Sequence, residues 1–376
     1  MNAFGSAASL LPSLSSGARI LLVRLRSIGD IILLTPALRL LKGWRPDLQL
    51  SVVVESRFRE LLDGNPNVAE VLDPGVGAGL AKIASRVGEI FQIRKRNFAL
   101  CMNLHGGPTS RLLTRASGAR WKVGFAHFRS PRLYDVLLPD ARLILGQPSV
   151  HTAEHQASAF FYLGLPRQEI PRAQLFVSAE NLAWWQEKKA SLGIPSGRTY
   201  AILHPTALYA TKQWPSENFA RLGTYLEHDA GMIPVFSCGS GESAVLDAVQ
   251  QAAEARIRRL EGSSLGEFAA ALSQCQLFVG NDSGPAHLAA ALSRPVVVIF
   301  SSSSSAIWGP WPRGATKPMA QVVQNPYDCN PCPGDRCYRF ERPECILSVT
   351  YEQVRMAVEA VVGDSRAPGS PPASAV

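Results

Sequence analysis

Short apolar runs that alternate with stretches of helical spacing are the feature that most constrains the fold of this chain. Residues 19–25 and 49–55 are rich in Leu, Ile and Val, and residues 31–42 between them carry apolar side chains at helical spacing. Further apolar runs lie at residues 98–103, 200–204, 233–238, 277–279 and 296–300. Strands that are apolar throughout are typical of parallel sheets with helices on both faces. The sequence therefore predicts a doubly wound α/β protein.

The chain has 376 residues, 46% of them hydrophobic and 18% charged, so it is expected to fold. This length favours two domains. The alternation weakens at residues 163–178, which contain two prolines, and we expect the boundary there. The predicted parts are domains at 19–170 and 171–350, a helix at 351–362, and disordered tails at 1–18 and 363–376.

Several protein classes are disfavoured by the sequence. The most apolar stretch, residues 20–41, is interrupted by four charged residues, so no membrane-spanning helix is predicted. Residues 1–18 lack the basic start of a secretory signal, and seven cysteines without such a signal argue against a disulfide framework. We therefore expect a cytoplasmic protein. The net charge of +8 favours an anionic partner: nucleic acid, a phospholipid surface or a phosphorylated small molecule.

The first strand-to-helix turn carries a carboxylate. In VRLRSIGDIILLTPAL, Asp30 directly follows Gly29 and opens the helical stretch. One interpretation is a helix N-cap, a position that favours Asp. The other is a general base that acts on an acceptor hydroxyl. Gly29 allows a ligand to come close, but the turn lacks the G-x-G-x-x-G pattern, so it does not predict a dinucleotide site.

The turn LFVGNDSGPAHLAAAL in the second half predicts an anion site. It follows an apolar run, and Pro285 suits the first turn of a helix. Gly284 lets a phosphate approach backbone amides and the positive end of the helix dipole. Asp282, Ser283 and His287 lie at the same edge. The alternative is a capped helix, with Asp282 or Ser283 as its cap and His287 on the surface.

The segment ILHPTALYATKQWPSENFARL places Thr206, Thr211 and Lys212 between an apolar run and a helix that starts near Pro215. A lysine here supplies the positive charge that a pyrophosphate leaving group requires, and the alternative is an exposed surface lysine. The chain contains no Asp-x-Asp, Walker P-loop, G-x-S-x-G or H-E-x-x-H motif. A pyrophosphate held by lysine and helix amides, without a bridging metal, is therefore favoured over hydrolase or kinase chemistry.

In their order and spacing, these three segments resemble glycosyltransferase family nine, the ADP-heptose lipopolysaccharide heptosyltransferases and their relatives. The resemblance covers residues 20–361 or so. It implies a GT-B fold, with two Rossmann-like domains that face a central cleft. The N-terminal domain would hold the acceptor and the C-terminal domain the nucleotide sugar. It also implies an inverting, metal-independent transfer of heptose from ADP-heptose to a lipopolysaccharide inner-core acceptor.

The resemblance also implies roles for single residues. Asp30 matches the family's proposed base, which takes the proton of the acceptor hydroxyl as the anomeric carbon is attacked. Lys212 matches the position that contacts the donor phosphates, and Glu242 in FSCGSGES is similar to the acidic residue that holds the ribose. The stretch TALYAT before Lys212 departs from the charged Thr-Arg-Asp-Asp character of the first heptosyltransferase, which leaves another nucleotide sugar open. The other donor-site positions are Thr206, Thr211, Asp282, Ser283, Gly284 and His287.

Residues 91–132 contain nine basic residues and no Asp or Glu. Blocks of one sign are typical of interaction surfaces, although a solvated basic face is the alternative. In the acceptor half such a block predicts a surface for a phosphorylated lipid sugar and the anionic inner leaflet, at about 1 kcal/mol per basic residue near the membrane. We thus expect a peripheral protein at the inner face of the inner membrane. No nucleic-acid motif accompanies the charge. The residues are Arg94, Lys95, Arg96, Arg111, Arg115, Arg120, Lys122, Arg129 and Arg132.

Four cysteines, Cys329, Cys332, Cys337 and Cys345, have a spacing that could close a structural four-thiolate metal site. The second pair is wider apart than in zinc ribbons, and free or redox-bridged thiols are the alternative. No cofactor is expected to be required for catalysis. A rival class for the whole chain is a noncatalytic basic binding protein with a metal knuckle, whereas an oxidoreductase is disfavoured because the glycine fingerprint is absent.

Overall fold

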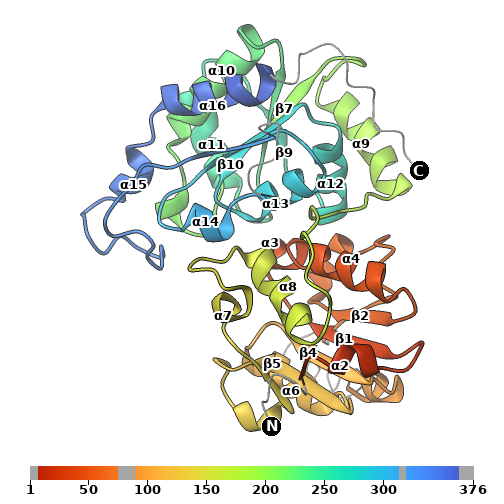
Figure 1. Ribbon diagram of the computed structural model, residues 1–376. Helices are drawn as coiled ribbons and strands as arrows, with labels where there is room; N and C mark the ends of the chain where they lie inside the picture. The colour runs from red at the N-terminus through yellow and green to blue at the C-terminus, as the bar shows by residue number, and fades with distance from the viewer. Residues whose placement is uncertain (1–6, 75–87, 89, 313–318, 364–376) are drawn as a thin grey trace. The chain divides into compact units, whose positions relative to one another are not determined.

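The computed structural model describes residues 7–74, 88, 90–312 and 319–363. The chain divides into two compact units, Met1–Ser178 and Ala179–Val376. In Figure 1 the first unit runs from red to yellow-green and the second from green to blue. Each unit contains one six-stranded sheet in which every pair of neighbouring strands is parallel. The predicted α/β class is confirmed.

The sheet of the first unit has the order β3-β2-β1-β4-β5-β6. Its central strands are apolar and buried on both faces, as expected for a parallel sheet covered by helices. The last strand of this unit, β6, lies at one edge of the sheet. The strands are β1 (Arg19–Val23), β2 (Gln49–Val53), β3 (Glu70–Leu72), β4 (Leu100–Asn103), β5 (Trp121–Phe125) and β6 (Val136–Leu138).

Helices connect these strands. The single helix predicted over residues 31–42 is two helices, α3 (Ile28–Ile32) and α4 (Thr35–Trp44). Pro36 lies in the first turn of the second of them, where the missing proline N–H costs no hydrogen bond. The others in this unit are α2 (Leu10–Ser13), η1 (Ser56–Leu61), α6 (Pro108–Ala116), η2 (Pro131–Leu133), α7 (Ala141–Leu145) and α8 (Thr152–Tyr162).

The disordered tail predicted at residues 1–18 is wrong for its described part, residues 7–18. Leu10 and Leu11 of α2 are buried, and the Leu11 N–H donates to the carbonyl of Leu163. The guanidinium of Arg45 donates to the carbonyls of Leu11 and Leu14 at 3.2 and 3.0 Å. Apolar burial and these bonds offset the entropy of ordering the segment.

The boundary between the units falls after Ser178 and not after residue 170. The intervening segment has no helix or strand, but Ala173 and Leu175 are buried. The backbone N–H of Gln174 donates to the hydroxyl of Thr35 at 2.9 Å. The segment therefore packs on the first unit, which its two prolines did not indicate.

The sheet of the second unit has the order β12-β11-β10-β7-β8-β9. Counted along the chain within each unit, both sheets follow the order 3-2-1-4-5-6 of dinucleotide-binding folds. All five residues of β7, β8 and β10 are buried. The strands are β7 (Tyr200–His204), β8 (Ile233–Ser237), β9 (Arg258–Leu260), β10 (Leu277–Asn281), β11 (Val296–Ile299) and β12 (Ala320–Val323).

The helices of the second unit include α12, whose capping box joins Ser264 and Glu267. Such reciprocal hydrogen bonds satisfy amides that the first turn leaves without a helical partner. No helix in the described ranges has the length and hydropathy needed to span a membrane. The helices are α9 (Ala179–Ser191), η3 (Ala210–Lys212), α10 (Ser216–His228), α11 (Ser243–Ala252), α12 (Leu265–Ser273), α13 (Gly284–Ala291), α14 (Ser305–Trp308), α15 (Glu344–Leu347) and α16 (Tyr351–Gly363).

The last helix, α16, packs within the second unit. Its residues Val354, Val358 and Val361 are buried in the apolar core that this unit builds around β7, β8, β10 and β11. The resemblance to GT-B proteins, whose last helix commonly crosses back onto the first domain, leaves such a crossing open for residues 351–362, and it stays a prediction. Gly363 closes α16, and the rest of the predicted C-terminal tail lies outside the described residues.

Candidate functional site

Each sheet has a topological switch point. This is the place between two adjacent central strands where the strand order reverses, so that the connections to its two sides run over opposite faces of the sheet. In the first unit it lies between β1 and β4, and in the second between β7 and β10. Ligands of such folds bind outside the carboxyl ends of the strands at this point. The residues predicted from the three motifs follow β1, β7 and β10, so each unit places its candidate residues at its own switch point.

Asp30 lies in the first turn of α3, three residues after the N-cap Ser27. One carboxylate oxygen, Oδ2, accepts from the Ser27 backbone N–H at 3.2 Å and from its hydroxyl at 3.3 Å. Asp30 is therefore the partner of the cap in a capping box and not the cap itself. Its side chain is 16% exposed.

Arg24 occupies the other side of the same carboxylate. Its guanidinium pairs with Asp30 Oδ1 and donates through a second nitrogen to the carbonyl of Leu104, which follows β4. The buried Gln156 of α8 donates to the Asp30 carbonyl at 2.8 Å. Arg24, directly after β1, and Gln156 of α8 thus fix the carboxylate and the backbone of Asp30. Our sequence analysis named neither Arg24 nor Gln156 as a site residue.

Two histidines, His105 and His155, interact with the charges of this ion pair, and the sequence analysis did not name them. Burial, and then the charges of Arg24 and Arg26, lower the pKa of His105. Burial and the charge of Arg24 lower the pKa of His155 to about 4, and His127 contributes in the same direction. His155 is stacked on Phe125 with ring centroids 4.3 Å apart. A neutral His155 can therefore accept or donate hydrogen bonds at neutral pH without adding charge.

The nine basic residues of the block do not surround Asp30 together. Arg111 lies in the first turn of α6, at the end of the helix that follows β4. Its guanidinium donates to the Ser130 hydroxyl at 2.8 Å. Arg96 precedes β4 and pairs with Glu70, while Lys122 sits at the start of β5. Parallel strands keep their two ends at opposite edges of a sheet. The set therefore divides into Arg94, Lys95, Arg96, Arg115, Arg120 and Lys122 toward the amino edge and Arg111 and Arg129 toward the carboxyl edge, with Arg132 in the connection that leads back to β6.

In the second unit, Lys212 and Asp282 come from different loops and meet. The Lys212 ammonium lies 2.8 Å from Asp282 Oδ2 and also donates to the hydroxyl of Ser303. The two charged side chains are only 17% and 9% exposed. This partly buried ion pair fixes the Lys212 ammonium at the switch point, with Asp282 as its counter-ion.

The turn between β10 and α13 lies beside this pair. Ser283 is the N-cap residue, but its hydroxyl donates to the Asn281 carbonyl at 3.2 Å and makes no cap hydrogen bond to the helix. His287 is buried at 7% exposure, so the alternative of a surface histidine is wrong. The buried Asn281, which the sequence analysis did not name, accepts from the Trp214 N–H and donates to the Pro205 carbonyl. Asn281 thereby joins the two donor-site loops.

The remaining donor-site residues are also held in place. The Thr206 hydroxyl lies 2.8 Å from His204 Nε2, and His204 Nδ1 lies 3.0 Å from the Ser237 hydroxyl. Complete burial lowers the pKa of His204 to about 4. Glu242, the N-cap of α11, accepts from the Gly239 N–H at 2.8 Å. This carboxylate follows β8, next to the switch point.

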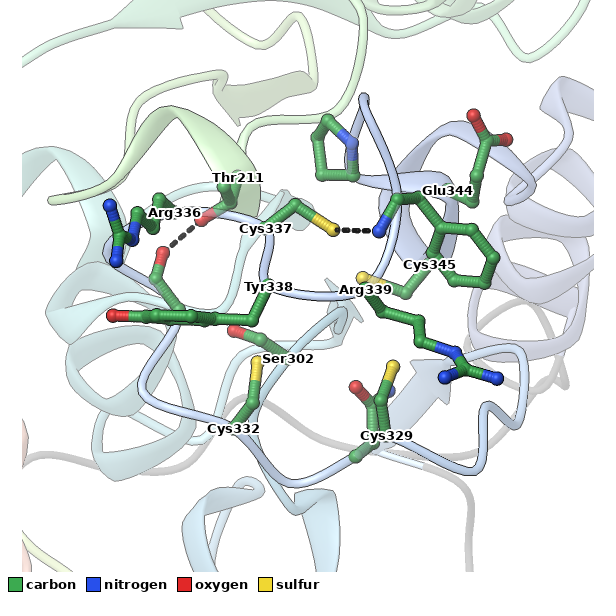
Figure 2. A pocket seen from close by; sticks show the side chains of 14 residues that line it. Thr211, Ser302, Cys329, Cys332, Arg336, Cys337, Tyr338, Arg339, Glu344 and Cys345 are labelled. Carbon is green, nitrogen blue, oxygen red and sulfur yellow. Dashed lines mark hydrogen bonds between the residues drawn. The ribbon is translucent and has the colours of Figure 1, made fainter.

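The four clustered cysteines line one small cavity (Figure 2). All four are free thiols. Burial raises the pKa of Cys345, and the other three thiols raise it further. As the side chains stand in the described part of the chain, they form no group of three or more metal ligands within coordinating distance.

Comparison with known proteins gives this geometry a context. Residues 90–338 match the family described as glycosyltransferase family 9 (heptosyltransferase). Lipopolysaccharide heptosyltransferase 3 of Escherichia coli K12 is 26% identical over 294 residues, which are 76% of this chain and 83% of that protein.

Two solved structures are similar in fold. The glycosyltransferase family 9 protein of Veillonella parvula has a TM-score of 0.77 at 21% identity, covering 92% of this chain and 97% of the other. The Escherichia coli heptosyltransferase WaaC, solved with ADP, has a TM-score of 0.67 at 21% identity, covering 91% and 99%. These likenesses confirm the predicted GT-B fold class. With a family match over most of its length, the chain belongs to glycosyltransferase family 9, the heptosyltransferase family, and is a glycosyltransferase.

Proposed function

We propose that this glycosyltransferase moves a heptose from ADP-heptose to a lipopolysaccharide inner-core acceptor. The observation that carries the proposal is the position of the motif residues: Asp30 in one unit and the Lys212–Asp282 pair in the other each follow a strand of a switch point. The lipopolysaccharide heptosyltransferase named above supports the acceptor class, and the ADP bound to WaaC supports the donor class.

We assign the second unit to the donor. In this proposal the Lys212 ammonium and the first turn of α13 hold the two phosphates, because a point charge and a helix N-terminus both stabilise anions. Asp282 and Ser283 contact the sugar side, with Gly284, His287, Thr206 and Thr211 shaping the same edge. Glu242 accepts hydrogen bonds from the ribose hydroxyls. ADP leaves without a bridging metal ion, since the lysine and amides carry its developing charge.

We assign the first unit to the acceptor. The Asp30 carboxylate takes the proton of the acceptor hydroxyl while the hydroxyl oxygen bonds to the anomeric carbon and the bond from that carbon to the β-phosphate oxygen breaks. Attack on the face opposite the leaving group inverts the anomeric configuration. Arg24 is a positioning residue in this scheme, because it orients the carboxylate from Oδ1 while Ser27 holds Oδ2.

The divided basic block suggests two roles. Arg111 and Arg129 lie toward the edge that carries Asp30, so we assign them to the phosphates of the acceptor. Arg94, Lys95, Arg115, Arg120 and Lys122 lie toward the other edge, where we propose contact with the anionic inner leaflet. Screening confines that attraction to about 8 Å at physiological salt. The enzyme would then work as a peripheral protein at the cytoplasmic face of the inner membrane.

Transfer by the full chain tests the proposal. The purified protein is incubated with a heptose-free core glycolipid and, separately, with ADP-heptose, ADP-glucose, UDP-glucose and GDP-mannose, and the products are weighed by mass spectrometry. We expect one heptose to be added from ADP-heptose, with inversion at the anomeric carbon by NMR. Transfer from another nucleotide sugar alone would replace the donor assignment. No transfer from any donor, together with salt-sensitive RNA binding, would favour the noncatalytic basic protein.

A further inference from the structure

Five consecutive serines, residues 301–305, follow β11 at the carboxyl edge of the second sheet. β11 lies next to β10 and runs parallel to it. The backbone N–H of Asp282, in the turn after β10, donates to the carbonyl of Ile299, the last residue of β11, at 2.9 Å. Residues 301–304, the serine loop, therefore begin beside the turn that carries Asp282. The sequence analysis did not name them.

The carbonyl groups of the serine loop are held from one side. The side-chain amide of Gln324 donates to the carbonyls of Ser301 and Ser303 at 3.0 and 2.7 Å. The backbone N–H of Cys332 donates to the carbonyl of Ser302 at 3.0 Å. Both donor residues lie in the segment that follows β12. Three consecutive peptide groups therefore have a fixed orientation.

The N–H groups of the same three peptides face the other way. The peptide bonds of the serine loop are trans, and the C=O and N–H of a planar trans peptide point in opposite directions. The amides of Ser302, Ser303 and Ser304 therefore point away from the segment after β12. Among the described residues, none accepts a hydrogen bond from these three amides. Successive free backbone N–H groups in a bend are typical of concavities that bind anions.

The side chain of Ser303 meets the lysine that we assign to the donor phosphates. The Lys212 ammonium donates to the Ser303 hydroxyl oxygen, and to Asp282 Oδ2 at 2.8 Å. An ammonium group has three N–H donors, so one is left for a ligand. Because the Ser303 oxygen accepts in this contact, its own hydrogen is also left to donate. Two hydrogen-bond donors thus lie on atoms that touch each other.

We propose that Ser303 binds the diphosphate of the nucleotide-sugar donor, with its hydroxyl donating to a phosphate oxygen beside the Lys212 ammonium. The free amides of the serine loop complete this phosphate subsite. The subsite rests on the proposed function, because it needs a diphosphate donor in the second unit. Asp282 neutralises Lys212 in their ion pair, whereas hydroxyl and amide donors attract an anion without a competing counter-ion. The same donors stabilise the charge that develops on ADP as it leaves.

Calorimetric titration of the full chain with ADP tests the contact. Ser303→Ala removes the hydroxyl, and we expect ADP to bind about tenfold more weakly, as for the loss of a hydrogen bond to a charged group. Ser303→Thr keeps a hydroxyl and should restore most of the affinity. Ser301→Ala is the matched control, because that hydroxyl is fully buried without a partner in the described part of the chain, and ADP binding should not change. An ADP affinity unaffected by Ser303→Ala would overturn the proposal.

A double variant separates direct contact from support of the lysine. If Ser303 touches the diphosphate itself, Ser303→Ala should weaken ADP binding further in a protein that already carries Lys212→Ala. Ligand-observed NMR titration with ADP covers the weak binding expected there. A hydroxyl that acts only by holding Lys212 has nothing to hold in this background, so the absence of a further loss would overturn the direct contact.

Titrations with UDP and GDP separate this subsite from the donor assignment. If the unaltered protein binds UDP or GDP but not ADP, the ADP-heptose donor is wrong. Ser303→Ala then still decides the phosphate contact, because that contact does not depend on the base. Binding of none of the three nucleotides would overturn both the subsite and the donor site in the second unit.

Discussion

The two candidate sites lie on sheets with the same strand order, but their charged side chains are held by different kinds of partner. The Asp30 carboxylate is held by Ser27 and Arg24, which lie three and six positions before it in the chain. Lys212 is held by Asp282 and Ser303, which come from loops far along the chain. The carboxylate of the first site is thus held by its own turn, although Gln156 and the Leu104 carbonyl support that turn from farther along the chain. The second exists only when the whole sheet has assembled.

This difference has an energetic side. Asp30 is oriented by groups that donate to it, so the direction of its carboxylate is set before an acceptor binds. The Lys212 ammonium instead has a carboxylate counter-ion in Asp282, and a donor phosphate must compete with that carboxylate. In the proposed mechanism the base is therefore preorganised, whereas donor binding has to rearrange the phosphate site.

The most direct test of this difference between the two sites is the substitution Asp30→Asn. Because this change removes the base and keeps the shape of the side chain, we expect kcat to fall by about a thousandfold, with ADP affinity unchanged by calorimetry. The exposed Asp63→Asn is the matched control and should keep full activity. Near-normal turnover in Asp30→Asn would remove this carboxylate from the mechanism.

Lys212 and Asp282 should respond with opposite signs. Lys212→Ala removes a charged hydrogen-bond donor worth about 1.5–3 kcal/mol, so ADP should bind about 10- to 100-fold more weakly. Asp282→Asn removes the competing carboxylate, and ADP should bind at least as tightly as to the unaltered protein. Lys212→Arg is the control that keeps the charge. Equal weakening by both variants would show that the pair acts as one rigid element.

Arg24→Gln should have a smaller effect than loss of Asp30. The variant leaves Ser27 to hold one carboxylate oxygen but frees the other, so the base spends less time in the reactive orientation. We expect kcat to fall about tenfold, with the KM for the donor unchanged. Arg24→Lys should recover part of the rate. A change confined to the acceptor KM would instead assign Arg24 to substrate binding.

The smallest expected effect concerns stability in acid. The pKa of His155 is about 4 in the folded chain, below its ordinary value of 6.5. Between these values the unfolded chain binds more protons, so the free energy of unfolding falls as pH drops from 6.5 to 4.

His155→Phe keeps the stack on Phe125 and should remove about 1–2 kcal/mol of that loss, measured by urea unfolding at pH 7 and 5. The exposed His228→Gln serves as control and should leave the difference between the two pH values unchanged. The pKa of His204 in the second unit is also about 4, so the loss of unfolding free energy that His204 causes should remain in this variant. An unaltered pH dependence in His155→Phe would contradict the assignment.

Much of the fold could be predicted from local apolar runs, because the central strands are buried on both faces. The missed strands have weaker signals. β3, β6 and β9 have three residues each, β12 (Ala320–Val323) has four, one of them Gln321, and β5 contains Lys122 and Gly124. Edge strands owe their form to a neighbour already in place, since their own residues are too few to specify it. The tail at α2 was missed because its anchor, Arg45, lies beyond the first strand.

The candidate site divides along the same line. Asp30, Lys212 and Asp282 could be found because strand-to-helix turns carry them to the switch points. Asn281 and Gln156 could not, since their roles depend on partners more than sixty positions away. The basic block was predicted as one surface because sequence distance does not tell which end of a strand a residue occupies. The cysteine spacing indicated a cluster but not its contact with Thr211.

The tether at the start of the chain matters to anyone who shortens this protein for crystallisation. Arg45 is held in turn by Asp47, whose pKa it depresses. A shortened protein that begins at Arg19 would lack two carbonyls that accept from the Arg45 guanidinium. It would also expose the apolar side chains that Leu11 covers. Such a trimmed protein should precipitate more readily, so fusion partners are better joined ahead of residue 7 than grafted onto the first strand.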